Sequence, residues 1–179
     1  RNAEQYGDLP ALSDKGSDGE WNTDTWSDVL SNALAVARAL YAMGFEKGDK
    51  LSIYSYNRKE WYLIYAASQM LNGVAVGVYH TCSPEEVEWV VGNSDSKFIF
   101  IGNNPQGGDD PAKLPANRFA AIIDDLPAIE VAVVLNDSGT LNHAKAISWQ
   151  DFLGKGTNVP DSDIRARIDG IQPDDTSSL

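Results

Sequence analysis

The sequence predicts an α/β fold in which a mostly parallel sheet is flanked by helices. Short apolar runs, typical of buried strands, alternate along the chain with longer segments of helical periodicity. Several of the helical segments begin at a capping residue, and some end at a glycine. Because parallel strands need a long connection between them, this alternation favours right-handed crossovers through helices.

Composition sets the first limits on function. The 179 residues are 42% hydrophobic and include five Trp, as expected for one globular domain. The net charge of −12 argues against nucleic acid or an anionic membrane as the main partner, because both are negatively charged. The single cysteine allows no internal disulfide, and no apolar run approaches the ~18 residues of a membrane span. We therefore expect a cytoplasmic protein without a transmembrane segment.

The first part of the chain predicts a hairpin and a helix. Residues 9–12 and 20–22 are expected to form two short strands around an Asp-Lys-Gly turn. A helix is expected from Thr25 to Met43, where Thr25 and Asp28 resemble a capping box and Gly44 ends the helix. The residues expected on its buried stripe are Trp26, Val29, Leu30, Ala33, Ala37, Leu40 and Tyr41.

The middle of the chain predicts strand, helix, strand and helix. Residues 51–55 alternate as in a strand, and residues 57–71 have helical periodicity. Residues 74–79 are almost entirely apolar, as in a central strand that is covered on both faces. The next helix is expected to begin after Ser83, with Glu86 completing a capping box, and to be closed by Gly92.

The last part of the chain predicts two more strands, with short helices around them. The expected strands are residues 97–101 and 131–135, and the expected helices are residues 118–125, 148–153 and 160–168. Residues 103–117 are expected to form a loop.

The loop His80–Cys82 is the first candidate for chemistry, because ligands of open α/β sheets usually lie between a strand and the following helix. A His and a Cys two residues apart could belong to a metal site or a nucleophile pair. However, the only other His is His143 and there is no other Cys, whereas a zinc site needs about four ligands. Catalysis by Cys82 is not expected, and a loop hydrogen bond is favoured for His80 over a place in a pocket wall.

Other polar clusters indicate no catalytic set. The acidic pairs at residues 109–110, 124–125 and 174–175 are expected to be solvated, because neighbouring residues rarely share a face. Gly107 and Gly108 lack the Lys and Ser/Thr of a phosphate-binding loop. The residues alone therefore predict an α/β domain with no catalytic residue, bound cofactor or metal ligand of its own.

Six segments together resemble the start of the adenylate-forming superfamily, and most of all the AMP-forming long-chain fatty acyl-CoA synthetases. They are residues 25–30 (TWSDVL), 43–53 (MGFEKGDKLSI), 57–61 (NRKEW), 73–86 (GVAVGVYHTCSPEE), 93–100 (NSDSKFIF) and 172–179 (QPDDTSSL). In this family a segment like the last one leads directly into a Ser/Thr/Gly-rich loop that handles ATP phosphates.

The resemblance implies that residues 1–179 are part of the large N-terminal domain of an acyl-CoA ligase, ending before the phosphate-binding loop. The full-length enzyme would use ATP, Mg²⁺ and CoA to convert a long-chain fatty acid to acyl-adenylate and then to acyl-CoA, and it could lie peripheral to a membrane. No catalytic residue can be carried over to this chain. His80 and Thr81 would lie at the edge of the substrate pocket, and the chain alone would be an inactive scaffold that self-associates.

Two alternatives remain open from the sequence. The chain could be a complete, non-enzymatic α/β module that binds a ligand or a partner. It could also belong to another adenylate-forming enzyme that activates an aryl acid or an amino acid.

Overall fold

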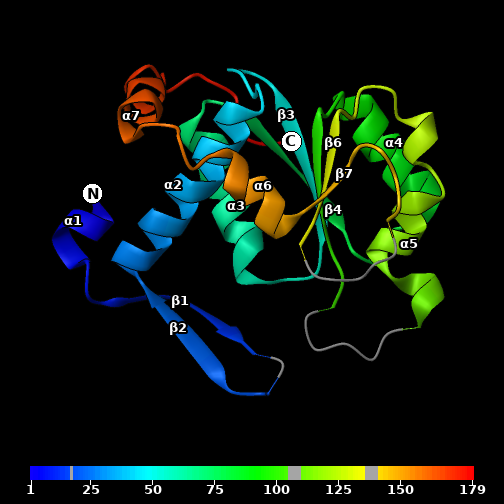
Figure 1. The fold of residues 1–179 in the computed structure, drawn as a ribbon, viewed down its shortest axis with the longest axis horizontal. Coiled ribbons are helices and arrows are strands. Elements are labelled where there is room, and N and C mark those ends of the chain that lie inside the picture. The colour runs from blue at the N-terminus through cyan, green and yellow to red at the C-terminus, as the bar shows by residue number, and fades with distance from the viewer. Residues whose placement is uncertain (17, 105–109, 136–140) are drawn as a thin grey trace.

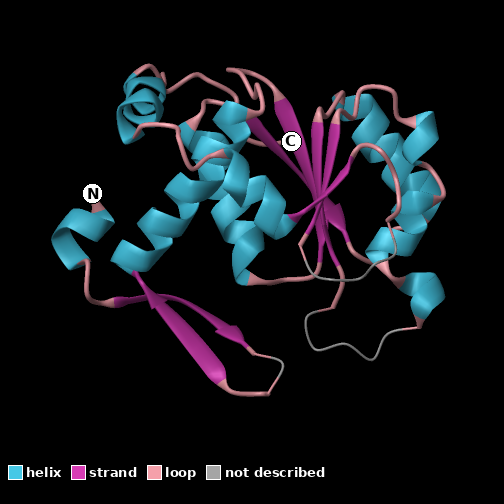
Figure 2. Cartoon of the chain, in the orientation of Figure 1, coloured by secondary structure: helices cyan, strands magenta, loops and turns pink. Residues whose placement is uncertain are grey.

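A five-stranded parallel sheet with helices on both faces forms the centre of the fold (Figures 1 and 2). The computed structural model describes residues 1–16, 18–104, 110–135 and 141–179. The strand order in the sheet is β4-β3-β5-β6-β7, and every neighbouring pair is parallel. An antiparallel hairpin of β1 and β2 lies apart from the sheet. The predicted α/β class with a parallel sheet and flanking helices is confirmed.

The strands are β1 (Pro10–Lys15), β2 (Trp21–Thr25), β3 (Lys50–Ser55), β4 (Val74–Tyr79), β5 (Phe98–Gly102), β6 (Val131–Val134) and β7 (Ala146–Ser148). The helices are α1 (Asn2–Tyr6), α2 (Trp26–Ala42), α3 (Lys59–Met70), α4 (Pro84–Ser94), α5 (Pro115–Ala120), α6 (Trp149–Lys155) and α7 (Asp161–Asp169), with 3₁₀ turns η1 (Pro111–Lys113) and η2 (Ile123–Asp125). The sequence did not predict α1, which buries no residue, or β7, which has three half-buried residues. Both are too short and too exposed to carry a periodic signal.

The capping signals placed most helix starts correctly. Thr25 accepts a hydrogen bond from the Asp28 backbone while the Asp28 carboxylate accepts one from Thr25, and Ser83 and Glu86 do the same for α4. The helix α4 was expected to close at Gly92, but it continues to Ser94. Asp95 ends it with φ at 52°, because Asp can adopt the left-handed conformation that glycine usually supplies.

Each face of the sheet has its own apolar core. Side chains of Leu51, Ile53, Phe98 and Phe100 pack on one face, against α2, α3 and α6. The opposite face holds a second cluster that includes Ile99 and packs with α4 and α5. Burial of apolar side chains on both faces of β5 accounts for its unbroken apolar sequence.

The expectation that residues 74–79 form a central strand covered on both faces was wrong. The strand β4 lies at the edge of the sheet and not at its centre, and Gly77 and Tyr79 are exposed. The central position belongs to β5, while β3, which lies between β4 and β5, is buried from Leu51 to Ser55. The sequence of β3 alternates between apolar and polar residues although the strand is buried. The polar residue Ser52 is tolerated there because its hydroxyl hydrogen-bonds with the Ser96 hydroxyl at 2.8 Å. Leu30, expected on the buried stripe of α2, is also exposed.

Residues 172–179 cover part of the outer edge of β4. The Ala75 backbone donates to the Ser177 carbonyl, and the Leu179 backbone donates to the Ala75 carbonyl, both at 3.1 Å. Asp175 anchors this segment, since its carboxylate accepts from Lys47 Nζ at 2.9 Å and from Asn72 Nδ2 at 2.6 Å. The Asp175 side chain is only 19% exposed, so the expectation that residues 174–175 are a solvated pair was wrong for Asp175.

The anchor makes this segment sensitive to acid. The backbone hydrogen bond from Gln172, with those from Lys47 and Asn72, lowers the pKa of Asp175 from 3.8 to about 2. Because the folded state lowers this pKa, the stabilising contribution is complete above about pH 4 and is lost as the pH falls through about 2. We expect a carboxyl ¹³C titration midpoint near 2 for Asp175, with exchange of the Leu179 amide accelerating over the same interval. A midpoint near 4 would show that the anchor is not formed.

Among the described residues, none of the helices has the length and apolar character needed to cross a bilayer.

Candidate functional site at the carboxyl edge of the sheet

A hollow of about 370 Å³ lies where β3 and β4 end. It is lined by Ser55, Asn57, Trp61, Gly77, Val78, Tyr79 and His80. The two strands are in parallel register, with Ser55 opposite Tyr79, so the loops that follow them leave the sheet at the same edge. This is the edge at which open α/β sheets bind ligands.

The wall of the hollow is largely apolar and aromatic. Trp61 reaches it from α3 and stacks on Tyr65, with ring centroids 6.0 Å apart. Gly77 leaves room in front of Trp61, since a Cβ atom at this position would stand 3.7 Å from Trp61 Cζ2. The polar side chains of Ser55 and Asn57 also contribute to the wall. Such a surface suits an apolar chain or ring and provides no evident nucleophile-base pair.

The structure places His80 in this wall and Thr81 beside it. The His80 ring stacks on Tyr56, with ring centroids 3.8 Å apart and an interplanar angle of 28°. This stack holds the half-buried imidazole at the rim of the hollow. Thr81 is exposed, and its carbonyl oxygen accepts a hydrogen bond from Arg118.

Two residues that sequence reasoning missed fix the loop His80–Cys82. Arg118 Nη1 donates to the carbonyl oxygens of Thr81 at 3.0 Å and of Cys82 at 2.7 Å. The Tyr54 hydroxyl donates to the Cys82 carbonyl at 3.2 Å. Burial raises the pKa of Tyr54, against the opposing effect of Arg118, so the hydroxyl keeps its proton at neutral pH. Arg118 lies 36 residues beyond Cys82, and no local pattern marks the contact.

Replacing Arg118 with Ala is expected to free this loop. The loss of charge-assisted hydrogen bonds to backbone carbonyls should lower the free energy of unfolding by about 1–2 kcal/mol. Chemical denaturation measures this loss, and ¹⁵N relaxation should show faster motion at residues 80–82. Arg165→Ala, at an exposed position of α7, is the matched control and should change the free energy of unfolding by less than about 0.5 kcal/mol. Equal losses in the two variants, with unchanged relaxation at residues 80–82, would contradict this role of Arg118.

The other candidates from the sequence do not join this site. His143 Nε2 pairs with the exposed Asp124 carboxylate at 3.2 Å, and Cys82 is half-buried. Gly107, Gly108 and Asp109 lie outside the described residues. Over the described ranges, His, Cys, Asp and Glu nowhere form a group of three or more that could hold a metal ion.

Comparison with known proteins identifies a matching family and several relatives of this chain. A family model described as AMP-binding enzyme matches residues 1–177. Among curated proteins, the long-chain-fatty-acid–CoA ligase ACSBG2 of Xenopus laevis is 23% identical over 175 residues, which are 98% of this chain and 22% of that protein. The long-chain-fatty-acid–CoA ligase FadD15 of Mycobacterium bovis is 25% identical over 162 residues, 90% of this chain and 24% of that protein. The chain thus spans less than a quarter of the length of these relatives.

Solved structures share the fold. Coronafacic acid ligase from Pectobacterium brasiliense superposes with a TM-score of 0.76 and 18% identity, over 99% of this chain and 31% of that one. The anthranilate CoA ligase AuaEII, solved with anthranoyl-AMP, gives a TM-score of 0.70 and 19% identity, over 87% of this chain and 27% of that one.

Proposed function

This chain belongs to the AMP-binding enzyme family, and we propose that it is part of a ligase that activates a long-chain fatty acid. A carboxylate oxygen of the acid would bond to the α-phosphorus of ATP while the bond to the bridging oxygen breaks and pyrophosphate leaves. The CoA sulfur would then bond to the acyl carbon, releasing its proton and AMP. The observation that carries the proposal is the family match over residues 1–177, and the names of the curated relatives suggest the substrate class.

Within that enzyme, we assign residues 1–179 to the large N-terminal domain as scaffold and pocket edge. ATP, Mg²⁺ and CoA would be handled by residues outside this chain, with Mg²⁺ offsetting the negative charge of the phosphates. The chain alone would then be inactive. The wall of Trp61, Gly77 and Tyr79, with His80 at its rim and Thr81 beside it, would contact part of the acyl chain.

The substrate class can be tested on the native-length polypeptide. With ATP, Mg²⁺ and CoA present, palmitate should give palmitoyl-CoA and AMP, both detectable by mass spectrometry. Anthranilate is the informative competitor, because one structural neighbour is named as an anthranilate CoA ligase. Formation of anthraniloyl-CoA in preference to palmitoyl-CoA would move the assignment to an aryl-acid ligase.

The pocket edge can be tested at Gly77. Replacing Gly77 with Leu should fill the hollow in front of Trp61 and lower kcat/KM for palmitate about tenfold relative to octanoate in the native-length enzyme. Gly154→Leu is the matched control, since a Cβ atom there would meet no heavy atom within 4 Å. If Gly77→Leu leaves the ratio of the two substrates unchanged, the hollow does not contact the acyl chain.

The state of the isolated chain is a further part of the proposal. Exposed aromatic side chains at Tyr79 and Trp89 favour self-association of the 179-residue chain. Sedimentation at micromolar concentration should therefore show species larger than 19.5 kDa. A single monomeric species would contradict this expectation without affecting the family assignment.

A further inference from the structure

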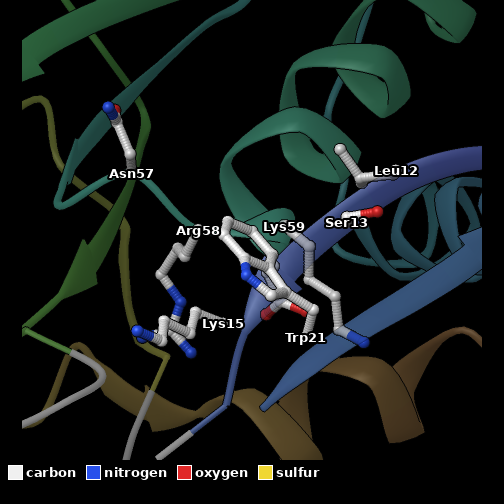
Figure 3. Close-up of a pocket in the computed structure, with 8 residues that line it drawn as sticks. Leu12, Ser13, Lys15, Trp21, Asn57, Arg58 and Lys59 are labelled. Carbon is white, nitrogen blue, oxygen red and sulfur yellow. The ribbon is translucent and has the colours of Figure 1, made fainter. Parts of the chain in front are cut away.

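A second pocket of about 370 Å³ lies between the hairpin of β1 and β2 and the start of α3 (Figure 3). The lining residues that matter for binding are Asp14, Lys15, Trp21, Asn57, Arg58 and Lys59. Asn57 also lines the hollow at the carboxyl edge, so the two cavities adjoin each other.

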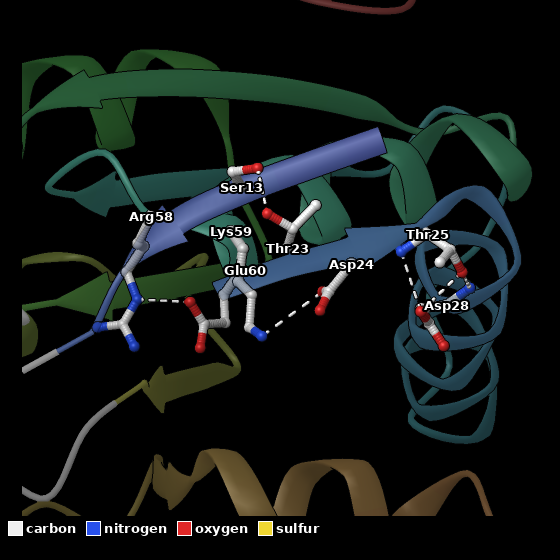
Figure 4. A network of polar contacts seen from close by, with 8 residues as sticks. All are labelled: Ser13, Thr23, Asp24, Thr25, Asp28, Arg58, Lys59 and Glu60. Carbon is white, nitrogen blue, oxygen red and sulfur yellow. Dashed lines mark hydrogen bonds and ion pairs between the residues drawn. The ribbon is translucent and has the colours of Figure 1, made fainter. Parts of the chain in front are cut away.

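Arg58 has unused hydrogen-bonding capacity in this pocket. Its side chain is only 10% exposed, and Nε donates to Glu60 Oε2 at 2.8 Å (Figure 4). Arg58 Nη1 is buried and has no hydrogen-bond partner among the described residues. A buried guanidinium N–H without an acceptor is unfavourable, and a ligand oxygen would relieve that cost.

The residues that line the pocket include more cations than carboxylates. Lys15 and Lys59 also line the pocket together with the carboxylate of Asp14, while Glu60 contacts Arg58 from outside this lining. Lys59 is 3.5 Å from Asp24, which leaves ammonium protons for a further acceptor (Figure 4). This gathering of cations is not a general property of the chain, whose net charge is −12.

The start of α3 adds to this preference. The helix has 12 residues, and its N-cap residue, Arg58, makes no side-chain capping bond. The partial positive charge of a helix N-terminus favours negatively charged oxygens, and the Glu60 carboxylate in the first turn already meets part of that preference. The helix start is therefore compatible with an anion at Arg58, and the buried Arg58 N–H is the observation that indicates one.

Trp21 gives the pocket a flat apolar side. The side chain comes from β2 and is 70% exposed, although it lines the cavity. In the view of Figure 3 its indole ring is seen between the side chains of Arg58 and Lys59. An exposed indole suits stacking with a flat ring, and the cationic groups beside it suit a negatively charged substituent on that ring.

We propose that this hairpin pocket binds a small molecule that has a phosphate group on a flat ring, with the phosphate at Arg58 and the ring against Trp21. Arg58 Nη1 supplies a hydrogen bond to a phosphate oxygen, and the cations in the lining favour a doubly charged group over a singly charged carboxylate. The cavity volume suits a ligand of that size. This binding does not depend on the acid-activating function proposed above.

An NMR titration of the ¹⁵N-labelled 179-residue chain tests the proposal with phenyl phosphate as the probe. We expect saturable shifts at the Trp21 indole N–H, assigned through Trp21→Phe, and at the Lys59 amide. Inorganic phosphate should shift Lys59 with weaker affinity, and phenol, which lacks the charge, should shift neither. If inorganic phosphate binds as tightly as phenyl phosphate, the site takes the free ion and the ring is not recognised. Absence of shifts at both groups with millimolar phenyl phosphate would overturn the proposal.

Variants identify the groups responsible. Arg58→Gln should weaken phenyl phosphate binding at least about tenfold, and Arg58→Lys, which keeps the charge but not the fork, should also weaken it. Arg165→Gln is the charge-matched control on α7 and should bind normally. Trp21→Ala, at an exposed position, should reduce phenyl phosphate affinity to that of inorganic phosphate. If Arg58→Gln disturbs the fold, Trp21→Ala still tests the proposal. Unchanged phenyl phosphate affinity in Trp21→Ala would refute the proposed ring contact.

Discussion

Replacing Phe100 with Ala is expected to lower the free energy of unfolding by about 3–5 kcal/mol, the largest loss that we expect from a single side-chain truncation in this chain. Phe100 is fully buried on β5, at the centre of the sheet. Its ring makes edge contacts with Phe152, at 5.3 Å between centroids, and with Trp149, at 6.3 Å. Truncation would remove the apolar contacts that hold α6 on the sheet and leave a cavity.

Chemical denaturation at low micromolar concentration measures this loss, which should also lower Tm by about 10 °C. Trp89→Ala is the control, because Trp89 is 69% exposed on α4 and its truncation should cost less than about 1 kcal/mol. A double-mutant cycle with Phe152→Ala should show coupling, since the two rings are in contact. Similar losses for Phe100→Ala and Trp89→Ala would contradict the assigned core.

Replacing Gly156 with Ala is expected to destabilise the fold by about 3 kcal/mol, although only one methyl group is added. A Cβ atom at Gly156 would lie 2.5 Å from the Ala39 backbone nitrogen and 2.7 Å from the Arg38 carbonyl carbon. These are backbone atoms of α2, which cannot rotate away, so α6 and α2 would have to separate. The backbone of Gly156 is in the ordinary helical region, and the effect is therefore one of packing.

Gly154→Ala, two residues earlier in α6, is the matched control. A Cβ atom there would meet no heavy atom within 4 Å, and Ala has the higher helix propensity. This variant should therefore be neutral or stabilise the fold by up to about 1 kcal/mol. Opposite signs for the two substitutions, measured by denaturation, would establish the close contact between α6 and α2. A loss below about 0.5 kcal/mol for Gly156→Ala would show that the contact is not formed.

Sequence reasoning worked where the signal is local. The capping boxes at Thr25 and Ser83 and the apolar run of β5 depend on neighbouring residues, so the elements that they mark were predicted near their observed positions. Local signals also have limits. Gly92 was expected to end helix α4, but the helix continues past it and ends at Asp95, which adopts the left-handed conformation. Periodicity identifies a helix face but not how far another element covers it, which is why Leu30 was misplaced.

Features set by long-range contacts were not predictable in the same way. The order of strands follows from tertiary packing. The apolar run of β4 predicts a central strand, whereas in the structure residues 177–179 are its partner on the outer edge. His80 was identified as a candidate from its position after a strand, whereas Arg118, which holds its loop, was not. The hairpin pocket around Arg58 was missed because Lys15 and Trp21 join it from a distant part of the chain.

We propose that this chain, a member of the AMP-binding enzyme family, is part of an enzyme that activates a fatty acid through an adenylate. Exchange of labelled pyrophosphate into ATP measures that half-reaction directly, without CoA. We predict that the native-length polypeptide catalyses exchange that depends on added palmitate, and that the 179-residue chain catalyses none. Failure of the folded native-length polypeptide to exchange pyrophosphate with palmitate would contradict the proposed activity, and palmitate-dependent exchange by the 179-residue chain would contradict its assignment as scaffold.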